Sequence, residues 1–459
     1  MRCDLPNLVR SRLTESNNKL ASESTLTCAE NNSTIPGNVS GNLNAEVDYK
    51  SYGKKVQLGQ KWKTAFRGSH GRLVTSLKVG SSNPDALKHS YVQHFRGHSD
   101  GIWHVTAASI GSCHIIASAS ADRTSKIWLA NDAHCVGNYV GHLGSVNSVA
   151  IRNTVDAEHI LLLTTSGDRQ SHIWKININN FGISSGNPNM SADDNESIST
   201  IPAIDLRDDD APNNSSGACT GESTKISTNI QISNKFQLIQ HPTLRLLGHN
   251  DVVISGEWMY GDEQLITASW DRTANVYDAE TGKIINTLSG HNQELTHCSA
   301  HSSQKLVATA SKDFTFRLWD FRESIQSVAV FQGHNDAVTS VAFTATHHIA
   351  SASDDLTTKL WDLRNMRSPM STVRLNSAVN TISVCHRPNL IAIPQDGRHV
   401  SVYDIHGMRL SRLPRASGKC HHRMVCCASW LPENNTNNLI TCGFDKQIVG
   451  WKFQFPHKS

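Results

Sequence analysis

Residues 248–291 read GHNDVVISGEWMYGDEQLITASWDRTANVYDAETGKIINTLSGH, a stretch that begins and ends with the same dipeptide. Between the two Gly-His pairs, short apolar runs alternate with turn-forming residues, which is typical of consecutive β-strands. The central turn carries Asp271, which stands six residues before an aromatic residue, Tyr277. The rest of the chain repeats this pattern on both sides.

The repeat has the length of one sheet unit. Where two Gly-His pairs follow each other without an insertion, the step from His to His is 42 to 44 residues. The pairs stand at Gly97-His98, Gly141-His142, Gly248-His249, Gly290-His291 and Gly333-His334. Each unit then has an Asp followed six residues later by an aromatic residue: Asp122/Trp128, Asp168/Trp174, Asp271/Tyr277, Asp313/Trp319, Asp355/Trp361 and Asp445/Trp451. A period of this length predicts one four-stranded propeller blade per repeat.

A hydroxyl residue stands four residues before each of these Asp residues. The His, hydroxyl, Asp and aromatic residues of one unit can therefore form a buried chain of hydrogen bonds that joins a loop, a turn and two strands. Each bond contributes about 1 kcal/mol, and a buried member left without a partner costs roughly 1–3 kcal/mol. We predict six structural tetrads of this kind: His98, Ser118, Asp122, Trp128; His142, Thr164, Asp168, Trp174; His249, Thr267, Asp271, Tyr277; His291, Thr309, Asp313, Trp319; His334, Ser351, Asp355, Trp361; and His421, Thr441, Asp445, Trp451.

Two further units are degenerate and bring the count to seven. Leu375 replaces the repeat His in one of them, and Cys420-His421 replaces Gly-His in the last. The sequence ends eight residues after Trp451, which leaves no room for a final outer strand. The alternating segment from Tyr91 to Phe95 is suited to supply that strand. We therefore predict an all-β, seven-bladed propeller that is closed by a blade built from both ends of the chain, because closure removes an exposed sheet edge.

Two segments are too polar to belong to the blades. Residues 1–88 are first rich in Ser, Asn and Thr and then basic, and residues 176–241 hold 8 acidic and 3 basic residues. Such segments bury too little apolar surface to offset the entropy lost on ordering. We predict a disordered N-terminal region over 1–88, a propeller over 89–459, and a disordered acidic insertion over 176–243, after the third strand of blade two.

Composition excludes several classes of protein. The 43 basic and 40 acidic residues leave a net charge of +3, so no general electrostatic attraction draws the chain to nucleic acid, and we expect no nucleic-acid partner. No run approaches the 18 apolar residues that a membrane span requires, and the first residues lack the apolar block of a secretory signal. We expect an intracellular protein whose eleven cysteines are reduced.

Several longer runs resemble the WD40-repeat family. They are TASWDRTANVYDAETG (267–282), NQELTHC (292–298), FRLWDFRE (316–323), NMRSP (365–369), RMVCCASW (423–430), TCGFDKQ (441–447) and the basic QLGQKWKTAF (57–66). The resemblance implies a scaffold without enzymatic activity, present in the cytoplasm and nucleus. It also implies a protein partner, a phosphofurin acidic cluster sorting protein that acts in trafficking.

The sequence contains only weak matches to motifs of catalytic or metal-binding sites. Residues 182–186, GISSG, match the spacing of a nucleophile elbow, but that motif needs a strand before it and a helix after it. The cluster Cys420, His421, His422, Cys426 and Cys427 contains residues that bind zinc. Neighbours on a strand face opposite ways, however, and His421 already belongs to a tetrad. We predict no catalytic residue, no metal, no cofactor and no small-molecule substrate.

A surface that binds a partner is the stronger hypothesis, because a rigid propeller presents loops around a central channel. Large aromatic residues in exposed turns are typical anchors of interfaces. Trp270 and Phe444 directly precede a repeat Asp, and Trp103 lies on an innermost strand near the channel mouth. Local packing of each aromatic residue is the alternative. The candidate partner-binding residues are Trp103, Trp270, Phe444 and the basic turn residues Arg123, Arg169 and Arg272.

Two other hypotheses rest on short motifs. Trp319-Asp320-Phe321-Arg322 and Trp361-Asp362-Leu363-Arg364 match the WDxR box, so Arg322 and Arg364 are candidate contacts for the adaptor of a cullin-type ubiquitin ligase. Ser191 starts a Ser-x-x-acid sequence in the acidic insertion and is a candidate phosphosite. Phosphorylation there would add about −2 charge, which suits a partner with basic side chains.

Overall fold

The computed structural model describes residues 87–455 except 112, 153–158, 178–235, 323–325, 346, 387, 416–417, 432 and 435. Nearly all of the N-terminal region 1–88 and most of the acidic insertion, with the GISSG motif and Ser191, lie outside the described residues. Within the described residues every regular element is a β-strand, and no helix is long and apolar enough to cross a membrane.

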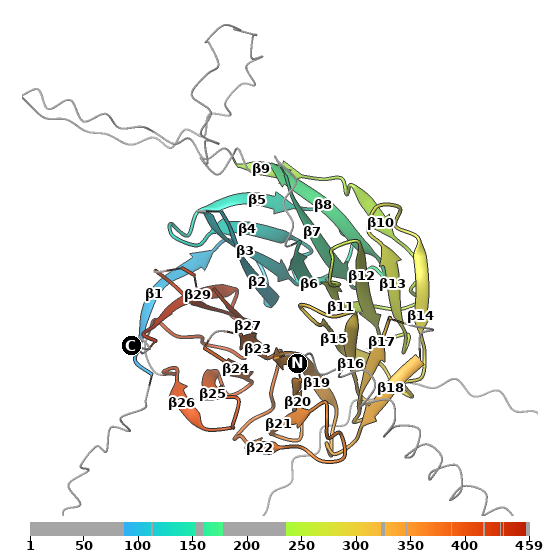
Figure 1. Cartoon of the computed structure of the whole chain (residues 1–459). Coiled ribbons are helices and arrows are strands. Elements are labelled where there is room, and N and C mark those ends of the chain that lie inside the picture. The colour runs from blue at the N-terminus through green and yellow to red at the C-terminus, as the bar shows by residue number, and fades with distance from the viewer. Residues whose placement is uncertain are drawn as a thin grey trace, which may run out of the picture. The chain divides into compact units, whose positions relative to one another are not determined.

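Seven sheets, six of four strands and one of five, stand around a central channel, so the prediction of a seven-bladed propeller is confirmed (Figure 1). Blade one contains β2 (Ile102–Ile110), β3 (Cys113–Ser120), β4 (Ser125–Leu129) and β5 (Cys135–Tyr139). Blade two contains β6 (Val146–Ile151), β7 (His159–Ser166), β8 (Ser171–Asn177) and β10 (Leu244–Leu246). Blade three contains β11 (Val253–Trp258), β12 (Gln264–Ser269), β13 (Ala274–Asp278) and β14 (Ile284–Leu288). Blade four contains β15 (Leu295–Ala300), β16 (Leu306–Ser311), β17 (Phe316–Asp320) and β18 (Gln326–Phe331).

The remaining blades follow the same order of strands. Blade five contains β19 (Val338–Ala345), β20 (His348–Ser353), β21 (Thr357–Asp362) and β22 (Ser371–Arg374). Blade six contains β23 (Ser383–Cys385), β24 (Leu390–Gln395), β25 (His399–Asp404) and β26 (Arg409–Arg412). Blade seven contains β27 (Val425–Trp430), β28 (Leu439–Gly443), β29 (Gln447–Phe453) and, as its outer strand, β1 (His89–Arg96).

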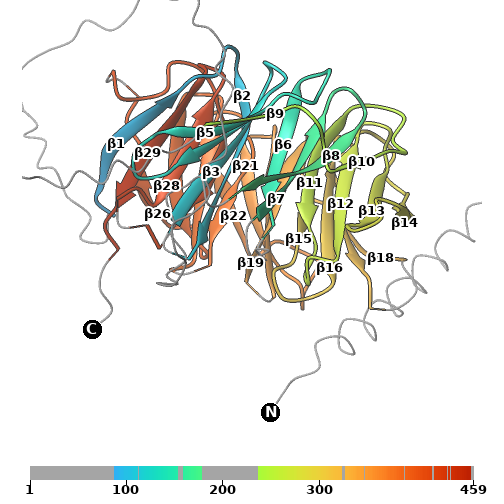
Figure 2. The ribbon, with the colours of Figure 1, turned by 90° about the horizontal axis from the view of Figure 1, so that it is seen from above.

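Blade seven closes the ring with strands from both ends of the described chain. β1 lies beside β29 (Figure 2) and pairs with it antiparallel. In this register Tyr91 is the Cα partner of Trp451. The prediction that the segment from Tyr91 to Phe95 supplies this strand is confirmed. A single core cluster then joins Phe95, Trp128 and Ile448, because the last blade packs against the first.

The innermost strand of six blades carries a β-bulge at one repeated position. The first residue of the strand is a fully buried aliphatic residue, and the register of strand pairing shifts directly after it. The shifts lie at Ile102/His104, Val146/Ser148, Val253/Ser255, Leu295/His297, Val338/Ser340 and Val425/Cys427. A bulge re-aims one side chain. Here the re-aimed Asn147 and Thr296 each donate a hydrogen bond to a carbonyl of the next blade, those of Val253 and Val338.

The structure corrects both bounds of the predicted insertion. The sequence predicts a disordered insertion over 176–243, but Ile176 and Asn177 belong to β8, and β9 (Gln237–Ile239) forms a fifth strand on blade one, parallel to β5. The chain then crosses to blade two, where β10 is the outer strand. A three-residue parallel strand has no sequence pattern of its own, and its pairing depends on where the chain returns to the sheet.

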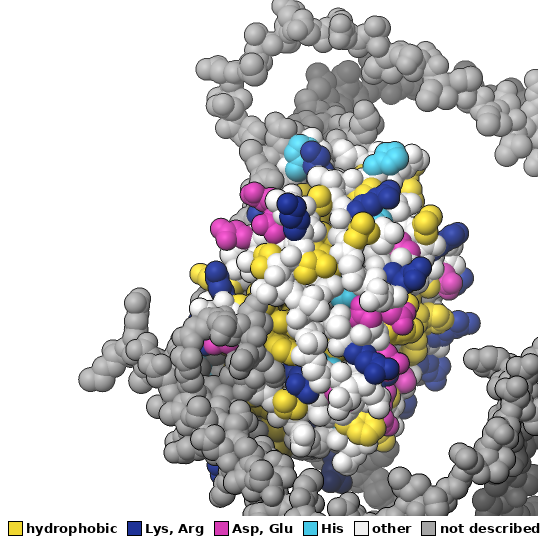
Figure 3. All heavy atoms as spheres, turned by 90° about the vertical axis from the view of Figure 1, so that its right-hand side faces the viewer, with side chains coloured by type: hydrophobic (Ala, Val, Ile, Leu, Met, Phe, Trp, Pro, Cys, Tyr) yellow, Lys and Arg dark blue, Asp and Glu magenta, His cyan; other side chains and the backbone are white. Residues whose placement is uncertain are grey.

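The outer side of the propeller carries both apolar and charged side chains. Figure 3 shows apolar and charged side chains interspersed over the side that carries β14 and β18. Ile284 and Ile285 on β14 are among the exposed apolar residues.

Candidate functional site

The tetrad residues meet at one end of the propeller. In blade one, His98 Nδ1 lies 2.8 Å from Asp122 Oδ2 and its Nε2 lies 2.8 Å from Ser118 Oγ, while Trp128 Nε1 donates to the same Oγ at 2.9 Å. The full chain of bonds recurs in blades four, five and seven, with Trp319, Trp361 and Trp451 as the indole donors. We call this end of the propeller, with its Gly-His loops and Asp turns, the turn face.

Each Asp of a tetrad also holds the backbone of its loop and turn. Asp313 Oδ2 accepts from Asn292 N, and its Oδ1 accepts from Thr315 N. Burial alone would raise the pKa of Asp355, but bonds from Thr357, Asn335 and His334 outweigh burial and hold this pKa at about 2. The carboxylates stay ionised near neutral pH and keep the turn face rigid.

Two blades depart from the tetrad. In blade two, His142 contacts Asp168 and Thr164, but Trp174 Nε1 has no partner among the described residues, and Tyr139 stacks on Trp174 with centroids 4.8 Å apart. In blade three, His249 contacts Asp271 and Thr267, and the Tyr277 hydroxyl, which replaces the indole, hydrogen-bonds with Thr267 and donates to Leu247 O at 3.3 Å.

Blade six replaces the tetrad with another buried set. Gln395 Oε1 accepts from Ser377 Oγ at 3.3 Å, and Gln395 Nε2 donates to Ser401 Oγ at 3.2 Å. Gln395 and Ser401 are both buried. The turn is therefore still tied to the strand, although no member of the His-Asp pair remains.

The predicted arginines occupy the tips of the turn face. Arg123, Arg169 and Arg272 each follow a tetrad Asp, have positive φ angles of 68°, 68° and 70°, and are exposed. The tips of the other four blades have the same left-handed backbone and are also exposed: Phe314, Leu356, Arg398 and Lys446. These four were missed, although reading the residue after each repeat Asp would have found three of them. The turn face thus carries five cationic tips and two apolar tips.

Trp270 is presented on the turn face. Its side chain remains 38% exposed, and Lys312 Nζ from blade four lies 5.0 Å from the centroid of its ring. A cation over an indole ring is an attractive arrangement. Leu143, which follows a Gly-His pair in blade two, is 83% exposed on the same face. Trp270 and Lys312 therefore form an amphipathic pair that is open to a partner.

Trp103 and Phe444 pack against each other instead. Their ring centroids lie 4.9 Å apart at the seam between blades one and seven, and both side chains are half-buried. Trp103 is the bulge residue of β2, and its Nε1 donates to Ser145 Oγ of blade two at 3.0 Å. The structure thus places Trp103 in the ring of bonds between blades, like Asn147 and Thr296, apart from Trp270.

The WDxR arginines lie at the opposite end. Arg322 and Arg364 follow β17 and β21 and pair with the Asp of their own motif, Asp320 and Asp362. Their side chains are 37% and 50% exposed. Both guanidinium groups are therefore held in place and accessible on neighbouring blades.

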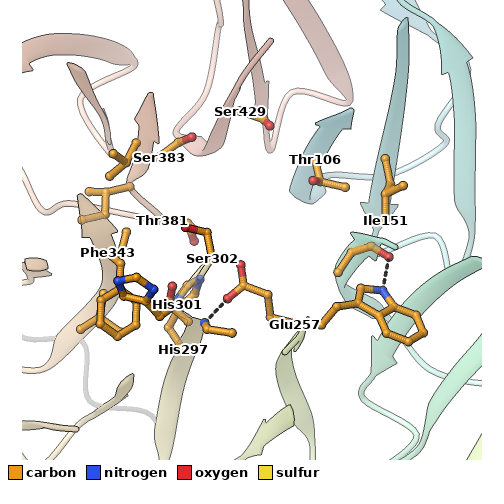
Figure 4. Close-up of a pocket in the computed structure, with 18 of the residues that line it drawn as sticks. Thr106, Ile151, Glu257, His297, His301, Ser302, Phe343, Thr381, Ser383 and Ser429 are labelled. Carbon is orange, nitrogen blue, oxygen red and sulfur yellow. Dashed lines mark hydrogen bonds between the residues drawn. The ribbon is translucent and has the colours of Figure 1, made fainter. Parts of the chain in front are cut away.

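The channel contains a polar cavity of about 560 Å³ that the sequence did not indicate. Figure 4 shows Glu257 on β11 and His297 on β15 among its lining side chains. Glu257 Oε2 accepts from Ala300 N at 2.5 Å, yet burial raises the pKa of Glu257 to about 7. Burial lowers the pKa of His297 to about 3. We call this space the channel cavity.

Metal-binding residues do not converge in the described part of the chain. No group of three or more His, Cys, Asp or Glu side chains there could hold a metal ion. Within the Cys420–Cys427 cluster, His421 contacts Asp445 and Thr441, and Cys426 and Cys427 are buried on β27.

Comparison with known proteins agrees with this geometry. The family described as WD domain, G-beta repeat matches residues 89–128, 133–175, 240–278, 282–320 and 325–362. WD repeat-containing protein 37 of Homo sapiens is 43% identical over 366 residues, which are 80% of this chain and 69% of that protein. The chain belongs to this WD-repeat family.

Two further proteins are similar to parts of this chain. WD repeat-containing protein 37 of Mus musculus is 41% identical over 366 residues, again 80% of this chain and 69% of that protein. A guanine nucleotide-binding protein subunit beta of Zea mays is 35% identical over 146 residues, which are 30% of this chain and 38% of that protein. The five matched ranges end at residue 362, so blade six and the three inner strands of blade seven lie outside them and are shown by the structure.

Proposed function

We propose that this WD-repeat protein is a non-enzymatic scaffold whose turn face docks a trafficking adaptor of the phosphofurin acidic cluster sorting type. The observation that carries the proposal is the exposed Trp270 beside Lys312, on a face with five cationic tips. An exposed indole supplies a large contact area with little entropy loss, and aromatic residues dominate binding energy at interfaces. The cationic tips suit acidic side chains of a partner.

The choice of partner rests on the family. The chain is similar to WD repeat-containing protein 37 over 80% of its length, and the resemblance of its longer runs implies this adaptor. The same resemblance supports a location in the cytoplasm and nucleus.

The test compares two exposed aromatic residues of blade three. Trp270 lies on the turn face, whereas Tyr260, 52% exposed, lies in the turn after β11 at the other end of the blade. Binding of purified chain to the purified adaptor is measured by calorimetry. We expect Trp270→Ala to weaken binding about 10- to 30-fold, as for an interface hot spot, and Tyr260→Ala to leave it unchanged. Equal affinity of Trp270→Ala and wild type would refute docking through Trp270.

A second candidate function is a substrate receptor of a cullin-type ubiquitin ligase. The observation that favours it is the exposure of Arg322 and Arg364 on neighbouring blades at the end opposite the turn face. The double variant Arg322→Ala/Arg364→Ala should lose a ligase adaptor in pull-down and keep the trafficking adaptor. A partner set that is unchanged by the double variant would remove this candidate.

A further inference from the structure

Two cysteines of blade seven face each other across neighbouring strands. Cys427 on β27 and Cys442 on β28 are Cα partners in the antiparallel register, directly after the bulge. In five other blades the same pair of positions combines a His or Ser with an Ala or Thr: His104/Ala119, Ser148/Thr165, Ser255/Ala268, His297/Ala310 and Ser340/Ala352. The fold therefore does not require a cysteine at either position, and only blade seven among these places two thiols together.

The two thiols are in contact. Both side chains are buried, and a hydrogen bond links the thiol groups of Cys427 and Cys442. Cys427 Sγ also lies 3.5 Å from Val105 O of blade one. Directly opposed residues of antiparallel strands have Cα separations of about 4.5–5.5 Å, which lie within the range that a disulfide spans.

Cys427 is also accessible to a small solute, although it is buried from bulk solvent. It is one of the residues that line the channel cavity, together with His104 and Glu257. The lining of the cavity also includes Tyr260, which is 52% exposed to solvent. A molecule of the size of water or hydrogen peroxide can therefore reach Cys427 without unfolding of the blade.

Neighbouring groups favour the reactive form of Cys427. Burial disfavours its thiolate, but bonds from Cys442 and His104 outweigh burial and hold the pKa of Cys427 well below its usual range. Burial and the neighbouring Cys427 raise the pKa of Cys442. Burial opposes a charge on His104, yet Cys427 and Glu257 raise the pKa of this imidazole. The pair thus combines a nucleophilic sulfur with a second, protonated thiol, which is the arrangement of an attacking and a resolving cysteine.

We propose that Cys427 and Cys442 form a peroxide-responsive dithiol, in which Cys427 is oxidised first and Cys442 resolves it to a disulfide. The Cys427 thiolate attacks one oxygen of hydrogen peroxide, so that an S–O bond forms, the O–O bond breaks, and hydroxide leaves with a proton from His104 as water. The sulfur of Cys442 then attacks Cys427, the S–S bond forms, and the sulfenic oxygen leaves with the thiol proton as a second water. Two thiols and one peroxide give one disulfide and two waters.

Oxidation would change the seam that closes the ring. A disulfide would join β27 and β28 covalently and draw Cys427 Sγ toward Cys442, next to its contact with Val105 O of blade one. The effect is confined to blade seven and its contact with blade one, where both ends of the described chain meet.

The experiment treats the full chain with hydrogen peroxide under native conditions, blocks remaining thiols with N-ethylmaleimide and maps the cysteines by mass spectrometry. Trypsin leaves Cys426, Cys427 and Cys442 in one peptide, residues 424–446, and further cleavage after Glu433 separates Cys442 from the other two. We expect the fragment with Cys427 and the fragment with Cys442 to remain joined by the disulfide until a reductant is added. Circular dichroism before quenching verifies that the propeller is still folded.

Two variants make the assignment specific. Cys442→Ala introduces the residue that blades one, three, four and five carry there, so it should fold, form no linkage and accumulate a sulfenic acid at Cys427 that dimedone traps. Cys426→Thr introduces the residue that blades four and five carry at the bulge, and it should still form the linkage. Free Cys427 and Cys442 in folded protein at a peroxide dose that has oxidised the partly exposed Cys113 and Cys135 would overturn the proposal. A linkage that forms only in urea would overturn it as well.

Discussion

Tyr91 in β1 and Trp451 in β29 are Cα partners whose ring centroids lie 6.1 Å apart in an edge-to-face arrangement. They come from the two ends of the described chain, so this pair marks the closure of the propeller. An open ring would leave the edge of β29 unpaired, and unpaired edges template aggregation. The stability of the whole ring therefore depends on how well β1 holds to blades seven and one.

The first prediction concerns this closure. Phe95 in β1 is buried and meets Trp128 of blade one edge-to-face, with centroids 6.1 Å apart. Phe95→Ala should lower the free energy of unfolding by about 3–5 kcal/mol, the range for a buried aromatic residue. Urea denaturation followed by tryptophan fluorescence measures the loss. The exposed neighbour Arg96→Ala is the control and should change stability by less than about 0.5 kcal/mol. Equal stability of both variants would contradict the closure.

The second prediction separates structural from exposed tryptophans. Trp319 is buried and donates to Thr309 Oγ1 at 2.9 Å, whereas Trp270 is partly exposed and contacts Lys312. Trp319→Ala should cost about 3–5 kcal/mol because it leaves a cavity and removes the donor of a buried tetrad. Trp270→Ala should cost less than about 1 kcal/mol. Thermal unfolding by circular dichroism checks both, and an unchanged midpoint for Trp319→Ala would refute the tetrad geometry.

The third prediction is a loss of stability in acid. Burial lowers the pKa of His172 and of His297 to about 3, whereas an unfolded His titrates near about 6.5. Between these values the unfolded chain binds more protons, so the free energy of unfolding falls as the pH falls, by about 1.4 kcal/mol per pH unit for each such group. Asp355, with a folded pKa of about 2, adds a further loss below about pH 4.

Glu257 acts against this trend and provides a control. Burial raises the pKa of Glu257 to about 7, so the folded chain binds this proton more tightly than the unfolded chain, and its contribution falls as the pH rises. Urea titrations at steps from about pH 7 to about pH 4 measure the net slope. Glu257→Gln should steepen the slope and His297→Gln should flatten it. A slope that neither substitution changes would contradict both assignments.

Much of the fold follows from spacing alone, because each repeated column corresponds to a physical link. The repeated His and Asp residues make the hydrogen bonds of the turn face, as His98 and Asp122 do in blade one. Closure was predictable because the last unit lacked an outer strand and the segment before the first Gly-His alternated suitably.

What the spacing did not predict depends on neighbours that are distant in sequence. Whether Trp103 is exposed is decided by Phe444 and Ser145 from other blades. Blade six keeps its turn through Gln395, which belongs to no repeated column. The sequence around Glu257 predicts a half-buried strand. Glu257 comes near His104 in the channel only because the blades close into a ring.

The last prediction uses the seam between Phe444 and Gly101. A Cβ added to Gly101 would lie 2.3 Å from Phe444 Cδ2, whereas the same position three residues after the repeat His carries a side chain in other blades, as at Ser145, Val252 and Ala337. Gly101 is therefore required by the ring of Phe444 and not by the backbone. Gly101→Ala should lower the free energy of unfolding by about 1–3 kcal/mol, the cost of overpacking.

A double-mutant cycle separates this clash from other causes. If the Phe444 ring is the obstacle, Phe444→Ala should make Gly101→Ala nearly neutral, and the double variant should be more stable than the sum of the single losses predicts by about 1 kcal/mol or more. Urea denaturation of the four proteins measures the coupling. Additive losses would show that Gly101 is needed for another reason, and the close packing of blades seven and one at this seam would have to be abandoned.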